Sequence, residues 1–246
     1  MSILVQTREL LETRYVELNK FLEHLSHLDM ARFETGHNTQ TLPSSEVTAV
    51  MKATVLIMNY SAVEATIVEV IDEVFSFVRN SGVTFRGISQ GVRKQLLSYK
   101  LRHIRSSGVG TIESFVDDTL RWALEDADFW LPDKSTIRDS FLGNLDARKI
   151  RLVTDQMGVT VLASKRTRNG SDLKEVKDSR NYLAHGYKSF VDLGQLKTTR
   201  ELQDQTNRIA EYLLAIIRAF EKELREGRVC ALPQSPGSSP GSILAR

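Results

Sequence analysis

The residues best suited to chemistry lie in one short stretch, residues 179–186, with the sequence Ser-Arg-Asn-Tyr-Leu-Ala-His-Gly. It contains a permanent cation at Arg180, an amide at Asn181 and an imidazole at His185. An arginine can hold a phosphate through two hydrogen bonds and stabilise charge that develops on it. A histidine can transfer a proton near neutral pH. Together these side chains suit phosphoryl transfer without a metal ion.

The stretch is predicted to end a helix of about four turns. We expect Ser171 to be the N-cap of this helix. Gly186 should stop it, because glycine tolerates the left-handed conformation just beyond a helix end. On a helical wheel Arg180 shares a face with the apolar residues Leu173, Val176, Leu183 and Ala184. A guanidinium on such a face needs a partner or an anionic ligand. The alternative is a surface arginine and, at position 185, a histidine that caps the helix.

A second charged residue is predicted to lie on an apolar helix face. Residues 44–79 form the longest predicted helix, which is apolar around most of its circumference and should therefore be central and largely buried. Glu64 falls on its apolar side, where a carboxylate must be paired or protonated. We hypothesise that Glu64 pairs with Arg180 and holds it in place. The alternative is that Glu64 lies at the rim and reaches water.

The remaining periodicity predicts an all-α bundle of about six or seven helices. Further helices are expected over residues 4–29, 89–105, 111–127 and 198–226, and one starts from the turn at residues 143–146. No segment is a convincing strand. We expect one domain over residues 1–230. Residues 231–246 consist largely of Ser, Pro and Gly and are expected to be disordered.

Two segments have the local positive charge that RNA binding requires. Residues 89–105 contain five Lys or Arg residues and no acidic residue, and Tyr99 among them could stack on a base. Residues 165–170 form a basic loop before the motif helix. A solvated helix face and a flexible connector are the alternatives. The candidate RNA-binding residues are Arg93, Lys94, Lys100, Arg102, Arg105, Lys165, Arg166, Arg168 and Lys188.

Composition limits the remaining possibilities. The chain has 246 residues and is 41% hydrophobic, which is enough for a real core in one domain. Its net charge of +2 gives no global attraction to nucleic acid. The single cysteine, Cys230, fits a reducing cytoplasm. We expect no signal peptide, no membrane span, no metal site and no bound cofactor, because the patterns typical of each are missing from the sequence.

Residues 180–186 resemble the signature of the HEPN superfamily, in which four to six residues separate an Arg, often followed by a polar residue, from a His. The sequences Gly-Asn-Leu-Asp at residues 143–146 and Asn-Tyr-Ser-Ala-Val-Glu at residues 59–64 resemble the MAE-type branch, for a core of about residues 45–225. The resemblance implies a homodimer in which two motif helices face each other and form one composite site.

The resemblance also implies a function. It suggests a metal-independent endoribonuclease in which Arg180, Asn181 and His185 are catalytic and the product ends in a 2′,3′-cyclic phosphate. Such an enzyme would be a toxin or take part in anti-phage defence, and an antitoxin or another partner protein would hold it inactive. The alternative is a non-catalytic binding or scaffold module, or a chain that acts only within a larger complex. The polar set on a core-facing stripe favours the enzyme.

Overall fold

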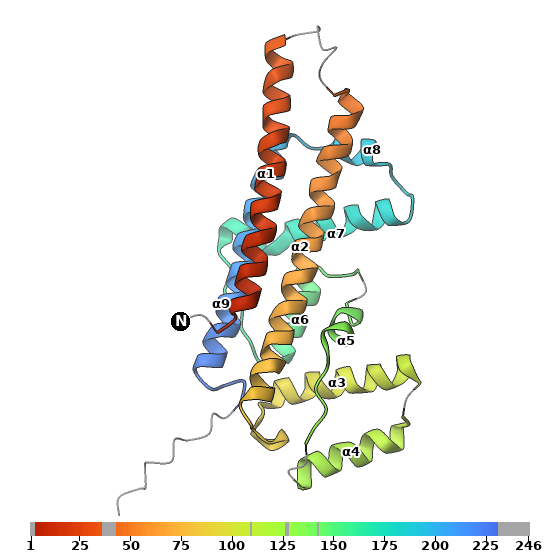
Figure 1. Cartoon of the computed structure of the whole chain (residues 1–246), viewed down its shortest axis with the longest axis vertical. Helices are drawn as coiled ribbons and strands as arrows, with labels where there is room; N and C mark the ends of the chain where they lie inside the picture. The colour runs from red at the N-terminus through yellow and green to blue at the C-terminus, as the bar shows by residue number, and fades with distance from the viewer. Residues whose placement is uncertain (1–2, 36–42, 109, 126–127, 142, 231–246) are drawn as a thin grey trace, which may run out of the picture.

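Three long helices form the main bundle of the protein. The computed structural model describes residues 3–35, 43–108, 110–125, 128–141 and 143–230. The long helices α1 (Val5–Thr35), α2 (Ser45–Asn80) and α9 (Thr199–Arg225) lie side by side (Figure 1). Each carries apolar residues at helical spacing, and the bundle buries these residues between the three helices. The prediction of an all-α fold is confirmed.

Helix α2 is the central element, as its apolar circumference predicts. It packs against α1, α9 and the shorter helices α5, α7 and α8, and half of its residues are buried. By length and composition alone α2 could cross a membrane, but 67% of its most apolar window is buried inside the protein. Burial in the core therefore accounts for its apolar character.

The shorter helices pack around α2. Helices α3 (Gln90–Ser107) and α4 (Ile112–Leu124) lie at the C-terminal end of α2, and α5 (Lys134–Asp139) and α6 (Ala147–Gln156) connect them to α7 (Ser171–Ala184) (Figure 1). Two 3-10 segments, η1 (Phe85–Gly87) and η2 (Lys165–Gly170), precede α3 and α7. The short helix α8 (Phe190–Gly194) packs on α2. No strand occurs in the described ranges, where Ile88 and Cys230 form an isolated bridge.

The structure differs from the sequence predictions at several boundaries. The N-cap of α7 is Gly170, in a left-handed conformation and without a side-chain cap, so the prediction of Ser171 is wrong. Helix α8, which was not among the predicted helices, begins with a capping box between Ser189 and Asp192. Helix α1 continues to Thr35. The predicted disordered tail at residues 231–246 lies outside the described residues.

Candidate functional site

Helix α7 carries the motif away from the bundle. It crosses α2, and its C-terminal end projects to the side before the chain returns through α8 (Figure 1). Leu173 and Val176 are fully buried and anchor its first half, whereas every residue from Ala184 to Phe190 is exposed. The helix ends where predicted, with Gly186 in the left-handed conformation at φ 69°. The chemistry-bearing residues thus lie at a solvent-facing helix end.

The guanidinium of Arg180 lies on a seat built by α2 and the turn before α6. It stands 5.8 Å from the centre of the Tyr60 ring, and its Nη1 donates a hydrogen bond to Asn181 Oδ1 at 3.2 Å. Gly143 has a φ of 70°, and a Cβ added there would lie 2.9 Å from Arg180 Nη1. The backbone N–H of Leu145 donates to the Tyr60 hydroxyl at 3.4 Å, and burial raises the pKa of this phenol. The turn and the ring together therefore fix where the cation lies.

Glu64 does not play the role hypothesised for it. Within the described residues, neither Glu64 nor Arg180 forms an ion pair. Glu64 is half-buried and lines a cavity of about 380 Å³ beside α5, together with Lys134 and Arg138. Tyr60 instead occupies the position that faces the guanidinium. Attraction between a cation and an aromatic face satisfies part of the charge without a carboxylate.

His185 is the most accessible member of the motif. Its backbone N–H donates to the carbonyl of Asn181 at 3.0 Å, so the residue ends the helix as a C-cap. Its ring lies 5.9 Å from that of Tyr187 at an interplanar angle of 43°. No side chain in the described ranges hydrogen-bonds to the imidazole. Both ring nitrogens can therefore reach a ligand.

The cations of α3 mostly bind α3 to its neighbours. Lys100 lies 3.8 Å from Asp118 and 5.3 Å from the Trp130 ring centre. Arg93 stands 5.9 Å from the Phe85 ring centre, and Arg102 donates to the carbonyl of residue 140 at 3.1 Å. Arg105 is exposed. These contacts weaken the case for α3 as an RNA-binding surface.

The expectation that Tyr99 stacks on a base is wrong. Its side chain is fully buried and packs edge-on against Phe75, with ring centres 5.9 Å apart. Val92, Leu96 and Tyr99 are spaced for one helix face, and all three are buried. That spacing was the signal in the sequence that placed Tyr99 in the core.

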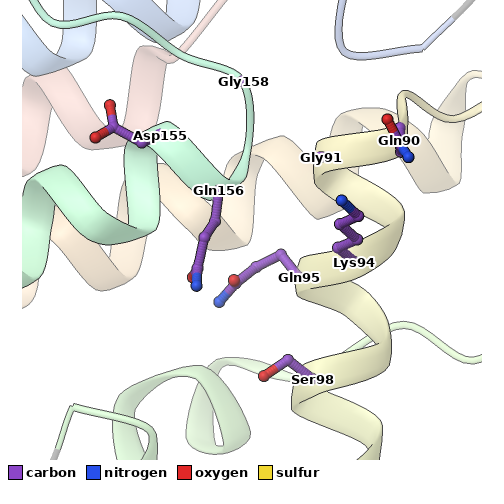
Figure 2. A pocket seen from close by; sticks show the side chains of 8 residues that line it. All are labelled: Gln90, Gly91, Lys94, Gln95, Ser98, Asp155, Gln156 and Gly158. Atoms are coloured by element: carbon purple, nitrogen blue, oxygen red, sulfur yellow. The ribbon is translucent and has the colours of Figure 1, made fainter.

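Lys94 lies on a polar cavity of about 410 Å³ between α3 and the end of α6 (Figure 2). The side chains of Gln95 and Gln156 extend toward each other across it, and Ser98 lies below them on α3. Among the eight lining residues only Lys94 and Asp155 are charged. The cavity therefore suits a polar ligand and does not concentrate positive charge.

The basic segment before α7 lies in a different setting. Lys165 and Arg166 are exposed on η2, and Lys188 stands 5.3 Å from the Tyr182 ring centre. Arg168 lines a cavity of about 550 Å³ together with four cations that were not among the candidate RNA-binding residues: Arg148, Arg151, Lys174 and Lys177. Helical periodicity predicts on which face of its own element each of these residues lies, but it does not predict that the elements meet. Across the described part of the chain, no three His, Cys, Asp or Glu side chains group as metal ligands would.

The helical bundle with Arg180, Asn181 and His185 at the end of α7 is of the HEPN class. The family model for MAE_28990-like HEPN proteins matches residues 6–228, and the chain belongs to this family. The match includes α1, so the family domain begins earlier than the core predicted at residues 45–225. The search of curated proteins finds no match, and neither does the search of solved structures.

Proposed function

We propose that the chain is a metal-independent endoribonuclease of HEPN type. One observation supports this most directly: a fixed cation, an amide and an accessible imidazole lie together at the projecting end of α7. Arg180 is seated on Tyr60 without a carboxylate that would neutralise it among the described residues. A cation in this state is available to an anionic group such as a phosphate.

In the proposed reaction the 2′-hydroxyl of one ribose attacks the adjacent phosphorus. The bond from phosphorus to the 5′-oxygen of the next nucleotide breaks, which leaves a 2′,3′-cyclic phosphate and a 5′-hydroxyl. His185 takes the proton from the 2′-hydroxyl or gives one to the leaving oxygen. Arg180 stabilises the charge that develops on the phosphate oxygens, and Asn181 orients the phosphate or His185.

The site is proposed to be complete only in a homodimer. Arg180 and His185 are five residues apart, so they point about 140° apart around an ideal helix. Two facing α7 helices would therefore let Arg180 of each chain approach the His185 of the other. Exposed apolar side chains beside the motif supply a surface for this pairing, namely Tyr182, Tyr187, Phe190 and Leu196.

The cellular role follows from the proposed activity. We propose a cytoplasmic toxin, or a component of anti-phage defence, whose substrate is RNA. An unrestrained ribonuclease would harm its own cell, so an antitoxin or another partner protein would hold it inactive.

A cleavage assay in EDTA tests the proposed activity. Wild-type protein is incubated with total RNA beside His185→Ala, Arg180→Ala and a control, His24→Ala, which removes an exposed histidine of α1. Wild type and the control should cleave and leave cyclic-phosphate ends. The two motif variants should lose on the order of 10²- to 10⁴-fold in rate. Absence of cleavage by folded, dimeric wild type would count against the enzyme.

A binding module is the second candidate, because α4 presents an apolar stripe to solvent. Ile112, Val116, Leu120 and Leu124 are four residues apart, share one face and are all exposed. The exposed carboxylates Glu113 and Asp117 flank this face. Such a surface fits an amphipathic helix of a partner protein that has apolar residues on one side and basic residues beside them.

Synthetic peptides separate this candidate from the enzyme. The probe is an amphipathic helix of Leu and Lys, and its control replaces each Lys by Glu. If α4 is a docking surface, the Leu/Lys peptide binds wild type, binds Leu120→Ser more weakly, and the Leu/Glu peptide does not bind. Equal binding of the Leu/Lys peptide to wild type and Leu120→Ser would remove the support for a module.

A further inference from the structure

A cationic cavity lies at the N-terminal end of α7, away from His185. It has a volume of about 550 Å³ and is formed by α6, η2 and the start of α7. Five of its lining residues are cations, Arg148, Arg151, Arg168, Lys174 and Lys177, and among the described residues only Asp146 gives it a negative charge. Like charges brought into one hollow repel each other, and a bound anion would relieve the repulsion.

Several of these cations have capacity for a ligand. Arg148 and Arg168 are exposed, and neither guanidinium makes a hydrogen bond or ion pair within the described residues. Arg151 Nη1 donates to the backbone carbonyl and to the side-chain Oδ1 of Asn169, at 3.1 and 3.4 Å, so this guanidinium is partly engaged. Lys177 is 3.0 Å from Asp146 and 3.5 Å from Asp178, and these two carboxylates cannot balance the five cations.

The start of α7 adds to the positive character of the cavity. Gly170 and Ser171 line it, and the N-cap makes no side-chain hydrogen bond. The positive end of the helix dipole therefore lies at the cavity wall. The nearby carboxylate of Asp172 is held by Arg208 through hydrogen bonds of 2.8 and 2.9 Å, so it does not neutralise the cavity cations.

One face of α7 connects the cavity to the motif. Lys174, Lys177, Asn181 and His185 fall within about 80° of each other on the helical wheel, so they form a polar track along the helix. Lys174 and His185 are 11 residues apart, or about 16 Å along the axis. That length corresponds to roughly five stacked nucleotides at about 3.4 Å each. Asp178 lies on the same track and is paired with Lys174 at 2.7 Å.

We propose that the cavity binds backbone phosphates of the single-stranded RNA that His185 cleaves, and so holds the strand along α7. The inference rests on the proposed ribonuclease function and adds a substrate requirement to it. A strand must extend about five nucleotides from the cleaved bond to reach the cavity. The cavity beside Lys94 does not compete for this role, because Asp155 offsets its one cation.

Binding and cleavage are tested with separate readouts. RNA binding is measured by fluorescence anisotropy in the His185→Ala background, with a 12-nucleotide RNA that carries a 5′-hydroxyl, so that only internal phosphates are present. The test variant adds Arg148→Gln and Arg168→Gln. The matched control adds Arg79→Gln and Lys222→Gln, which neutralise two exposed cations of α2 and α9 that have no ion pair among the described residues.

The test variant should bind about tenfold more weakly than the background at moderate salt, and the control should bind equally. The slope of log K against log salt should become shallower by about 1.4, at about 0.7 for each phosphate that the protein no longer neutralises. Circular dichroism and thermal unfolding should be unchanged, because neither guanidinium makes a hydrogen bond or ion pair in the part of the chain that the structure describes. Equal affinity and equal slope for the two folded variants would overturn the proposal.

Cleavage by enzyme with His185 intact then separates the two proposals. Adding Arg148→Gln and Arg168→Gln should slow cleavage of the 12-nucleotide RNA about tenfold but leave a dinucleotide, which is too short to reach the cavity, unaffected. If the variant cleaved the 12-nucleotide RNA at the wild-type rate, the proposed binding of RNA in the cavity would be refuted, but the proposed ribonuclease activity would not. If the test variant bound RNA more weakly but neither it nor wild type cleaved RNA, the proposed ribonuclease activity would be refuted and the cavity would remain an RNA-binding site.

Discussion

The two ends of α7 are built in opposite ways. At its N-terminal end, Gly170 is packed so closely that an added Cβ would lie 2.7 Å from the Cβ of Ala147 and 3.0 Å from the Tyr212 ring. Asp172 there is buried and held by Arg208. At the C-terminal end, a Cβ added to Gly186 would have no atom of the described residues within 4 Å, and His185 is exposed.

This difference separates stability from chemistry within one helix. Short helices owe most of their stability to tertiary packing, and here that packing lies in the first half of α7. The last turn contributes little and is free to present Arg180, Asn181 and His185 to another molecule. A helix fixed at one end can thus hold polar groups away from the core without the cost of burying them.

Equivalent glycine substitutions at the two ends test the comparison directly. Gly170→Ala should lower the free energy of unfolding by about 3 kcal/mol, because a close contact adds to the strain of the left-handed backbone. Gly186→Ala adds only the strain of the left-handed backbone and should lower the free energy of unfolding by about 1 kcal/mol. Urea unfolding measures both. Equal losses would mean that the N-terminal end is not the anchor.

A substitution in the seat of Arg180 should have a smaller effect, and this effect should appear in the rate of RNA cleavage. Gly143→Ala should displace the guanidinium, since the added Cβ would lie within 3.1 Å of three of its atoms. We expect cleavage to fall about tenfold, or about 1.4 kcal/mol in transition-state stabilisation. Adding Gly143→Ala to Arg180→Ala should cost little more, because both act through one side chain.

The control for Gly143→Ala is Gly82→Ala. Gly82 has a φ of 62° and nothing within 4 Å of a Cβ, so it imposes the same backbone strain far from Arg180. It should lose stability like Gly143→Ala while keeping full cleavage. A similar loss of cleavage in both variants would assign the effect to general destabilisation.

The sequence predicted the individual helices better than the contacts between them. Periodicity located α2, α3 and α9 because each buries one regular apolar face. The end of α7 followed from Gly186. Periodicity could not show that Tyr60, four residues before Glu64, would face Arg180. A wheel assigns a residue to a side of its own helix, whereas the contact depends on how two helices cross and on a turn at Gly143.

The same limit applies to positive charge, as a comparison of α3 with the cavity formed by α6, η2 and α7 shows. Residues of α3 such as Lys100 are engaged by rings and a carboxylate. Arg148 and Arg168 are far apart in sequence but meet in one cavity. Counting cations along the chain favoured α3, and only the packing of α6, η2 and α7 revealed the stronger cluster. The left-handed conformation of Arg168 has no signal in its residue type.

The smallest effect we predict is a pH dependence at the anchored end of α7. Burial raises the pKa of Asp146, but hydrogen bonds from the Lys149 backbone N–H and from Lys177 outweigh it and lower the pKa below its ordinary value of 3.8. A depressed pKa in the folded state adds stability above the ordinary value, and that stability is lost as the pH falls through the folded value.

Wild type should therefore lose stability as the pH falls below about 4, and Asp146→Asn should lose less over the same range. An asparagine still caps α6, so the variant isolates the charge from the cap. Asp117→Asn, at an exposed position of α4, serves as the control and should follow wild type. Thermal unfolding from pH 6 to pH 3 measures all three. If Asp146→Asn follows wild type as closely as the control, the bond from Lys177 does not help to anchor α7 to α6.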